Sequence, residues 1–291
     1  MTHYACNAIF QPVPLVENRQ VAEETFLASL YCPEIAAKIL PGQFVMIRVH
    51  GCNDPLIGRA FAMYDRIYGD SGEPLGIDII YLVKGKFTQA LSRLRQDDLL
   101  DIGGPLGNTF STERVNHLVM AVGGVGQTPM LSVGREALGS QVFGDSLGSQ
   151  STNRSGYANK VTILYGARTA SRLAGVRDFQ ESGFDVRLST DDGSIGVPKQ
   201  VTDLLQELLA ELPPDESVRI VSCGPEPMMA AIASIAKEKN LACEVSLETP
   251  MACGIGICFT CVAKVRQLDG QWDYQRTCVE GPIFDAAKLS W

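Results

Sequence analysis

Leu118-Val-Met-Ala-Val-Gly-Gly-Val-Gly-Gln-Thr-Pro129 is a buried-strand pattern that runs directly into a glycine turn. A turn between a strand and a helix can bring backbone N–H groups and a helix N-terminus to a phosphate or a nicotinamide. The pattern is not the G-x-G-x-x-G fingerprint, because Pro129 occupies the place of the third glycine. Gly123, Gly124 and Gly126 are therefore candidate dinucleotide-binding residues, and a tight structural turn is the alternative reading.

Downstream of this turn, predicted strands alternate with predicted helices. The strands are 161–165, 185–189 and 218–222, and the helices are 201–212 and 227–240. That alternation indicates parallel strands with crossover helices. We therefore predict an α/β domain with a parallel sheet over residues 113–240. A stretch rich in Gly, Ser, Asn and Gln, residues 139–159, predicts a flexible insertion within it.

A second turn follows the strand predicted at 218–222. Cys223, Gly224 and Pro225 stand at its carboxyl end, on the edge where ligands bind in open parallel sheets. A simple strand-to-helix turn with proline near the first helical position also explains them. Two such turns on one sheet edge favour a shared ligand crevice.

Upstream, residues 1–112 have a different texture. Short alternating runs such as 43–49 and 77–83 are separated by clusters of Gly, Pro, Asn and Asp. This is typical of antiparallel strands joined by turns. The predicted fold class is therefore α+β and multidomain: an antiparallel β-barrel, an α/β parallel-sheet domain, and a small C-terminal lobe over residues 241–291.

The C-terminal lobe holds the cysteines that carry chemistry. Cys253, Cys258, Cys261 and Cys278 follow the spacing C-x4-C-x2-C-x16-C, whose first three positions match the plant-type [2Fe–2S] pattern. Gly254 and Gly256 permit the tight bending that three thiolates on one short loop require. A zinc site and ordinary buried cysteines are the alternatives. The remaining cysteines are expected to be small buried hydrophobic residues: Cys6, Cys32, Cys52 and Cys243.

Composition narrows the function classes. The chain has 291 residues and a net charge of −8, which disfavours binding to nucleic acid or to an anionic membrane. No apolar run approaches the roughly 18 residues of a membrane span, and the first residues lack the pattern of a secretory signal. A cytoplasmic location is the expectation.

Taken together, these motifs resemble those of the electron transfer subunits of type B dihydroorotate dehydrogenase, within the wider ferredoxin reductase family. The resemblance runs through nearly the whole chain, and its most specific segments are the residues around Glu248–Cys253 and Gly281–Phe284. It implies an FAD-binding barrel over 1–112, an NAD(H)-binding domain over 113–240 and a [2Fe–2S] lobe over 241–291.

The resemblance also implies which residues lie near FAD. The family's Arg-Pro-x-Ser motif falls on Arg59, Ala60, Phe61 and Ala62, so Arg59 would pair with the pyrophosphate, while the proline and the serine are missing. The next flavin segment falls on Ile80, Tyr81 and Leu82, and then on Phe87 and Thr88, where Leu82 lacks a charge and Phe87 replaces a glycine.

The implied function is electron transfer between NAD(H) and the FMN-containing catalytic subunit of dihydroorotate dehydrogenase in pyrimidine biosynthesis, within a heterotetramer. Cys223 is expected to line the nicotinamide site without acting as a nucleophile. Asp191 and Asp192 favour NAD over NADP, whereas Arg168 favours the reverse. Two alternatives stay open: a reductase module for a hydrogenase or a ferredoxin-linked transhydrogenase, and a non-enzymatic zinc-binding or redox-sensing protein.

Overall fold

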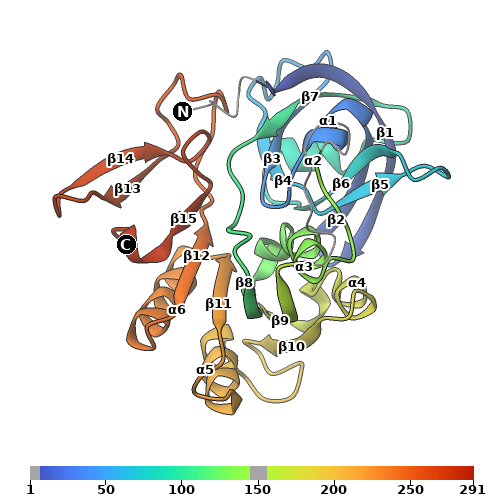
Figure 1. Cartoon of the computed structure of the whole chain (residues 1–291). Coiled ribbons are helices and arrows are strands. Elements are labelled where there is room, and N and C mark those ends of the chain that lie inside the picture. The colour runs from blue at the N-terminus through green and yellow to red at the C-terminus, as the bar shows by residue number, and fades with distance from the viewer. Residues whose placement is uncertain (1–6, 145–155) are drawn as a thin grey trace.

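The computed structural model describes residues 7–144 and 156–291. Its first seven strands form one antiparallel sheet in the order β4-β3-β7-β1-β2-β6-β5, which curls around its own apolar core (Figure 1). The bounds are β1 Ile9–Ala22, β2 Thr25–Tyr31, β3 Phe44–Val49, β4 Arg59–Ala62, β5 Asp65–Tyr68, β6 Pro74–Leu82 and β7 Leu99–Leu106, with helices α1 Pro33–Lys38 and α2 Lys86–Leu91. The predicted antiparallel barrel is confirmed.

The second sheet has the order β10-β9-β8-β11-β12-β15, and all its pairs are parallel except the last. Its strands are β8 Val115–Gly123, β9 Ala158–Ala167, β10 Asp185–Thr190, β11 Val218–Cys223, β12 Ala242–Ser246 and β15 Ile283–Asp285. The predicted parallel α/β sheet is confirmed. Strands β12 and β15 come from the segment expected to form the C-terminal lobe, so this lobe is built onto the edge of the sheet.

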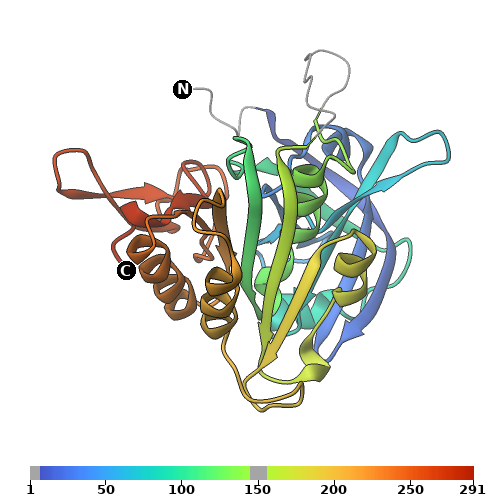
Figure 2. The same cartoon turned by 60° about the horizontal axis from the view of Figure 1, so that its bottom comes forward.

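Helices cover both faces of the second sheet (Figure 2). Residues of α3 and α4 share an apolar core with the barrel residues Leu27 and Ile80, whereas α5 and α6 pack on the opposite face. The helices are α3 Met130–Leu138, α4 Val176–Glu181, α5 Val201–Glu211 and α6 Glu226–Glu238, and the 3-10 helices are η2 Gly124–Gln127, η3 Ala170–Arg172 and η4 Ala286–Lys288. None of the described helices is both long enough and apolar enough to span a membrane.

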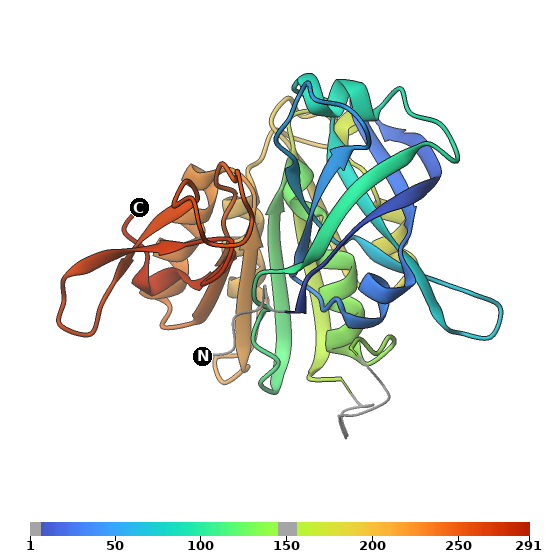
Figure 3. The ribbon, with the colours of Figure 1, turned by 90° about the horizontal axis from the view of Figure 1, so that it is seen from above.

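The last sheet is a hairpin of β13 Val262–Arg266 and β14 Trp272–Arg276. Figure 3 shows it projecting from the molecule on the side opposite the β5–β6 hairpin. One face of the hairpin packs inward through Val265, which is 4 % exposed. The other face carries Trp272 and Tyr274, each about half exposed.

Both ends of the segment predicted to be an insertion, residues 139–159, pack into the fold. On its N-terminal side, Phe143 is buried against the barrel core, and the guanidinium carbon of Arg66 lies 4.7 Å from the centre of its ring. On its C-terminal side, Tyr157 is buried and β9 begins at Ala158. Residues 145–155, like Cys6, lie outside the described residues.

Polar contacts join the barrel to the α/β domain. The Tyr64 hydroxyl donates a hydrogen bond of 2.5 Å to Asp178, and Arg135 forms an ion pair with Asp65. Next to Arg135, burial raises the pKa of Glu136 from 4.5 to about 7, although the nearby Arg66 charge opposes that shift.

Glu136 makes the stability of the protein depend on pH. Because the folded state holds the Glu136 proton up to about pH 7 and the unfolded state releases it near 4.5, stability falls as pH rises through that window. The loss is at most about 3.5 kcal/mol, at about 1.4 kcal/mol for each pKa unit. We expect Glu136→Gln to be more stable than wild type at pH 8 and to show a flatter profile in urea unfolding between pH 5 and 8.

The matched control is Glu238→Gln, on an exposed position of α6. It should leave the profile unchanged, and some slope should persist in both variants because burial also raises the pKa of Asp78 to about 6. Equal pH profiles for Glu136→Gln and wild type would contradict the assignment.

Candidate redox site

The sixteen residues between Cys261 and Cys278 form the β13–β14 hairpin. Cys261 directly precedes β13, Cys278 follows β14 by two residues, and Val262 pairs with Arg276 at the base of the hairpin. The Thr277 N–H donates a hydrogen bond of 2.7 Å to the Cys261 carbonyl. Antiparallel pairing therefore brings together two cysteines that are distant in sequence, and both are 1 % exposed.

The other two candidate ligands lie on a tightly bent loop. Gly254 and Gly256 have φ values of +70° and +83°, in the left-handed region that favours glycine. Cys253 is half-buried and Cys258 is exposed. The Ile257 N–H donates a hydrogen bond of 3.4 Å to the Cys253 sulfur, so the bend turns a backbone donor toward a thiol.

The four thiols are arranged as two pairs. Hydrogen bonds from Thr260, followed by one with Cys253, lower the pKa of Cys258 to about 6. Burial, followed by a hydrogen bond with Cys261, raises the pKa of Cys278 to about 12. Over residues 7–144 and 156–291, no group of three or more His, Cys, Asp or Glu side chains is arranged to hold a metal ion.

This pairing favours one of the two candidate metal centres. Structural zinc gathers four ligands around one centre. A [2Fe–2S] cluster with four cysteines takes two thiolates on each iron. The donor set, two pairs of thiols on a glycine-bent loop and a hairpin base, therefore fits a [2Fe–2S] cluster better than a single zinc ion.

The cysteine loop packs against the outer face of the barrel. Cys261 and Cys278 share an apolar cluster with Phe44 and Met46 of β3, and Ala60 of β4 packs against the same cluster. A Cβ atom on Gly254 would lie only 2.6 Å from Met46 Cγ. The predicted cluster ligands and the predicted flavin strand are thus neighbours in space, although about 190 residues separate them in sequence.

Strand β4 presents the candidate flavin residues. Arg59 is exposed, and its Nη1 donates to the carbonyls of Ile57 and Gly58 at 2.9 and 3.0 Å, which leaves its other N–H groups free for a phosphate. β4 is the terminal strand of its sheet, so one edge of its backbone has no partner strand. These features fit a dinucleotide with a pyrophosphate and a polar ring edge.

Several predicted flavin residues cannot act through their side chains. Ile80, Tyr81 and Phe87 are each at most 2 % exposed, and the Tyr81 hydroxyl donates to Asn18 at 2.9 Å. Thr88 is also engaged, because its hydroxyl accepts from the N–H groups of Lys84 and Gly85 at 2.9 and 3.0 Å. Thr88 therefore shapes the start of α2, and the buried residues leave only their backbone for a cofactor. Leu82 is half-buried at the end of β6.

The two glycine turns meet at the carboxyl ends of β8 and β11. These neighbouring strands mark the point where the strand order reverses, which is where open α/β sheets bind ligands. A Cβ on Gly126 would lie 2.3 Å from the Cys223 carbonyl oxygen, and one on Gly224 would lie 2.9 Å from the Gly123 nitrogen. Gly124, at φ +56°, begins η2, and the Pro225 ring lies against Gly123. The two turns therefore pack against each other at this edge, and the ligand crevice between them stays a prediction.

Cys223 ends β11 beside the first glycine turn as a neutral thiol. It is 7 % exposed, and burial, reinforced by the Glu248 charge, raises its pKa to about 12. A thiol that holds its proton at neutral pH is a poor nucleophile. The raised pKa fits the expectation that Cys223 is not a nucleophile, whereas its place beside a nicotinamide stays a prediction.

The acidic pair and Arg168 lie side by side on the same sheet edge. The N–H groups of Asp191 and Asp192 donate to the carbonyls of Ala167 and Arg168 at 3.1 and 3.2 Å. Asp192 accepts hydrogen bonds from Ser194, which fixes its carboxylate. Both charge signs predicted to influence the choice between NAD and NADP are therefore present together.

The four remaining cysteines are all predicted to be buried, and those among the described residues differ in their burial. Cys32 and Cys243 are buried, and burial raises the pKa of each to about 12, as expected for small hydrophobic residues. The prediction for Cys52 is wrong, because its turn leaves it half-exposed with its thiol donating to the Asp54 carbonyl at 3.3 Å. Cys6 is not among the described residues.

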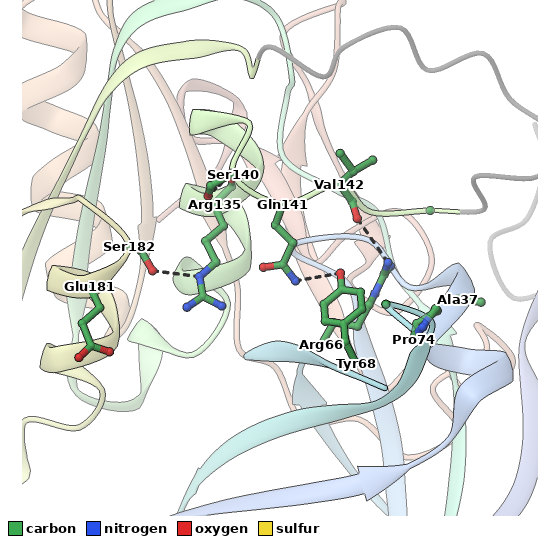
Figure 4. Close-up of a pocket in the computed structure, with 12 residues that line it drawn as sticks. Ala37, Arg66, Tyr68, Pro74, Arg135, Ser140, Gln141, Val142, Glu181 and Ser182 are labelled. Atoms are coloured by element: carbon green, nitrogen blue, oxygen red, sulfur yellow. Dashed lines mark hydrogen bonds between the residues drawn. The ribbon is translucent and has the colours of Figure 1, made fainter. Parts of the chain in front are cut away.

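A cavity of about 780 Å³ lies apart from these groups (Figure 4). It opens between the β5–β6 hairpin and the C-terminal ends of α3 and α4, and Arg66, Tyr68 and Gln141 line it. The Gln141 amide donates to the Tyr68 hydroxyl at 3.1 Å. Because α3 begins just after the glycine turn at 123–126 and ends at this cavity, the cavity lies at the other end of α3, away from the two glycine turns.

Some residues of the site were not anticipated from the sequence. Met46 forms the seat of the cysteine loop, and the signal was available, since the run Phe44–Ile47 is apolar on both faces of one strand. Arg276 and Glu280 lie on either side of Cys278 and form an ion pair. Residues four apart in sequence can pair in this way only where the backbone turns, and the sequence does not show that turn.

Comparisons with known proteins agree with this geometry. Residues 12–110 match the family model of the oxidoreductase FAD-binding domain. Residues 248–290 match that of the iron-sulfur cluster binding domain of dihydroorotate dehydrogenase B.

Curated relatives align along almost the whole chain. The electron transfer subunit of dihydroorotate dehydrogenase B (NAD(+)) from Caldanaerobacter subterraneus subsp. tengcongensis is 31 % identical over 94 % of this chain and 96 % of its own length. The subunit of the same name from Clostridium acetobutylicum is 32 % identical over 87 % of each chain.

Solved structures show the same arrangement. A chain of an NADH-dependent reduced ferredoxin-NADP oxidoreductase superposes with a TM-score of 0.75 and 26 % identity, covering 96 % of this chain and 90 % of that one. The cytochrome b5 reductase domain of Ulva prolifera nitrate reductase, at 17 % identity and a TM-score of 0.59, covers 80 % of this chain and shares the fold.

Proposed function

Because the chain belongs to the family of electron transfer subunits of dihydroorotate dehydrogenase B, we propose that it carries electrons between NAD(H) and an FMN-containing catalytic partner that oxidises dihydroorotate. The observation that supports the proposal is an apolar cluster that contains Cys261 and Cys278 and against which Ala60 of β4 packs, so the proposed cluster ligands lie beside the proposed flavin strand. When bound, FAD supplies hydride exchange with nicotinamide, and a [2Fe–2S] cluster supplies one-electron transfer.

The chain's own groups have distinct tasks in this scheme. Cys253, Cys258, Cys261 and Cys278 hold the cluster. Arg59 and the free edge of β4 hold FAD, with Thr88 setting the loop before α2. The paired glycine turns at 123–126 and 223–225 admit NAD(H), and their lack of side chains lets a flat ring lie against the backbone.

The surface around Cys258 is where the partner docks in this proposal. Cys258 is exposed, and its neighbours Ile257 and Phe259 are 75 % and 61 % exposed. Apolar side chains with such exposure beside a cluster ligand favour a protein interface that excludes water. The full assembly is proposed to be a heterotetramer of two such chains and two catalytic subunits, located in the cytoplasm, whose reducing conditions keep the ligand thiols free.

We expect Ile257→Asp to weaken binding of the catalytic subunit by about thirtyfold or more, because a charge at the centre of an apolar contact costs about 2 kcal/mol. Affinity is measured by titration calorimetry with the purified FMN subunit. The control is Val197→Asp, an apolar side chain of 62 % exposure on the α/β domain, which should bind like wild type. Equal affinities for wild type and Ile257→Asp would exclude this loop from the interface.

The function is tested with the reconstituted protein and its proposed partner. Visible spectra should show flavin bands together with the broad absorption of a [2Fe–2S] cluster. With dihydroorotate and the FMN subunit, the complex should reduce NAD+, and each subunit alone should not. A protein that binds zinc without iron and oxidises no NADH would instead support the zinc-binding or redox-sensing alternative.

A second candidate function has its own support. The match to the ferredoxin-NADP oxidoreductase covers almost the whole chain at 26 % identity. The same cofactors would then serve another redox partner, such as a ferredoxin-linked transhydrogenase or a hydrogenase. Co-purification decides between them: a stable complex with the FMN subunit favours the first proposal, and its reproducible absence favours the second.

A further inference from the structure

Arg276 ends strand β14 and touches three parts of the cysteine lobe. Its Nη1 donates a hydrogen bond of 2.8 Å to the Gly256 carbonyl. Its guanidinium carbon lies 5.0 Å from the centre of the Phe259 ring. Its Nε donates to both carboxylate oxygens of Glu280 at 3.1 and 3.2 Å, and Nη2 also pairs with Glu280.

These three contacts connect the two segments that carry the candidate ligands. Gly256 lies between Cys253 and Cys258, and Phe259 lies between Cys258 and Cys261. Arg276 and Glu280 bracket Cys278 on the returning segment. One side chain, 22 % exposed, therefore ties the loop bearing three thiols to the segment bearing the fourth.

The guanidinium also places a fixed positive charge beside the thiols. A [2Fe–2S] cluster held by four thiolates is anionic when oxidised and gains a further negative charge on reduction. A nearby cation stabilises the reduced form more than the oxidised form, which raises the reduction potential. Glu280 offsets that charge and holds the fork of the guanidinium in place.

We propose that Arg276 is a positioning residue that holds the cysteine loop against the hairpin base and raises the reduction potential of the cluster. The negative charge of Glu280 partly offsets this rise. This inference rests on the proposed binding of a [2Fe–2S] cluster. It concerns residues of this chain that neither coordinate iron nor contact the nicotinamide crevice.

Because Arg276 and Glu280 carry opposite charges, removing one or the other should shift the reduction potential in opposite directions. Arg276→Gln should lower the potential measured in a redox titration of the reconstituted protein followed by EPR. Glu280→Gln should raise it. A tenfold change in the ratio of reduced to oxidised cluster at fixed potential, or about 59 mV for one electron, is the size we expect for Arg276→Gln.

Two further variants separate position from charge. Arg276→Lys keeps the charge but loses the planar fork, so iron and sulfide content should fall while any cluster that forms keeps a potential near wild type. Arg266→Gln removes an equal charge from the same face of the hairpin. Arg266 pairs with Trp272, which lies four residues before Arg276 on β14, so the two arginines are roughly 13 Å apart at 3.3 Å per residue. Arg266→Gln should shift the potential much less than Arg276→Gln.

Each outcome is decisive. Equal shifts in Arg276→Gln and Arg266→Gln, or shifts of the same sign in Arg276→Gln and Glu280→Gln, would overturn the tuning role. If Arg276→Gln holds no cluster, the positioning role stands and the Glu280→Gln titration alone decides tuning. A wild-type protein that binds no iron–sulfur cluster under reconstitution defeats the proposed function itself, which keeps the two failures apart.

Discussion

Gly254→Ala is expected to abolish assembly of the [2Fe–2S] cluster while the rest of the chain stays folded. At φ +70° an alanine is strained by about 1–2 kcal/mol. Its Cβ would also lie 2.6 Å from Met46 Cγ, an overpacking that costs a further 1–3 kcal/mol, roughly. Because the loop must hold its bend to present Cys253 and Cys258 together, iron and sulfide content after reconstitution should fall to near zero.

Gly270→Ala is the matched control for this prediction. Gly270, at φ +82°, carries the same backbone strain at the tip of the hairpin, but nothing lies within 4 Å of its Cβ position. It should retain a full complement of iron. Adding Met46→Ala to Gly254→Ala should restore part of the iron content, because only the steric term is relieved. Full iron content in Gly254→Ala alone would show that the bend is not required.

Gly126→Ala is expected to reduce NADH-dependent reduction of a dye acceptor by at least a hundredfold. The added Cβ would lie 2.3 Å from the Cys223 carbonyl oxygen and 2.7 Å from the Gly224 nitrogen. These are backbone atoms at the end of a buried strand, so they cannot move aside as a flexible side chain would. The two turns must separate, and a crevice displaced by even 1 Å loses about two orders of magnitude in rate. Steady-state rates over a range of NADH concentrations measure the effect.

Gly183→Ala tests whether the place of the added methyl group, rather than mere loss of a glycine, explains that result. Gly183 follows α4, outside both glycine turns, and has φ +81° with no atom within 4 Å of its Cβ position. Its substitution should cost about 1–2 kcal/mol of stability from strain and leave the NADH-dependent rate unchanged. Flavin absorbance should be unchanged in both variants, since Arg59 and β4 are untouched. A wild-type rate in Gly126→Ala would mean that the contact with Cys223 is unimportant.

The sequence predicted the fold class well where one physical signal was sufficient. Buried strands at 118–122 and 218–222, each followed by a glycine turn, are enough to predict neighbouring parallel strands and a shared crevice. The spacing of Cys253, Cys258 and Cys261 similarly predicts a bent loop, and the positive φ values of Gly254 and Gly256 bear this out.

Side-chain direction was harder to predict. Tyr81 and Phe87 lie in the flavin segments by motif, yet both side chains pack in the barrel core, where Phe61 lies 6.1 and 5.8 Å from their ring centres. A motif aligned by sequence says which strand approaches a cofactor, but the register of that strand decides which residues face it. The run Phe44–Ile47 indicates that both faces of β3 are covered, but nothing in it identifies Gly254 as the residue that packs on Met46.

The way in which the C-terminal lobe joins the parallel sheet could not be predicted from the sequence either. Strands β12 and β15 complete the parallel sheet, because Val245 pairs with Phe284 across about forty residues of intervening chain. Nothing in the local pattern of either strand names its partner. Long-range pairing of this kind depends on the whole fold.

The β13–β14 hairpin changes how the interval between the third and fourth cysteines should be understood. The pairing of Val262 with Arg276 at the base of the hairpin brings Cys261 and Cys278 together. The tip of the hairpin, around Leu268, is fully exposed to solvent. Coordination of the cluster therefore does not require sixteen residues between Cys261 and Cys278. Because the tip is exposed and the base is paired, the ribbon can lengthen or shorten by pairs of residues without moving either sulfur, so a search pattern for this architecture should leave that interval open.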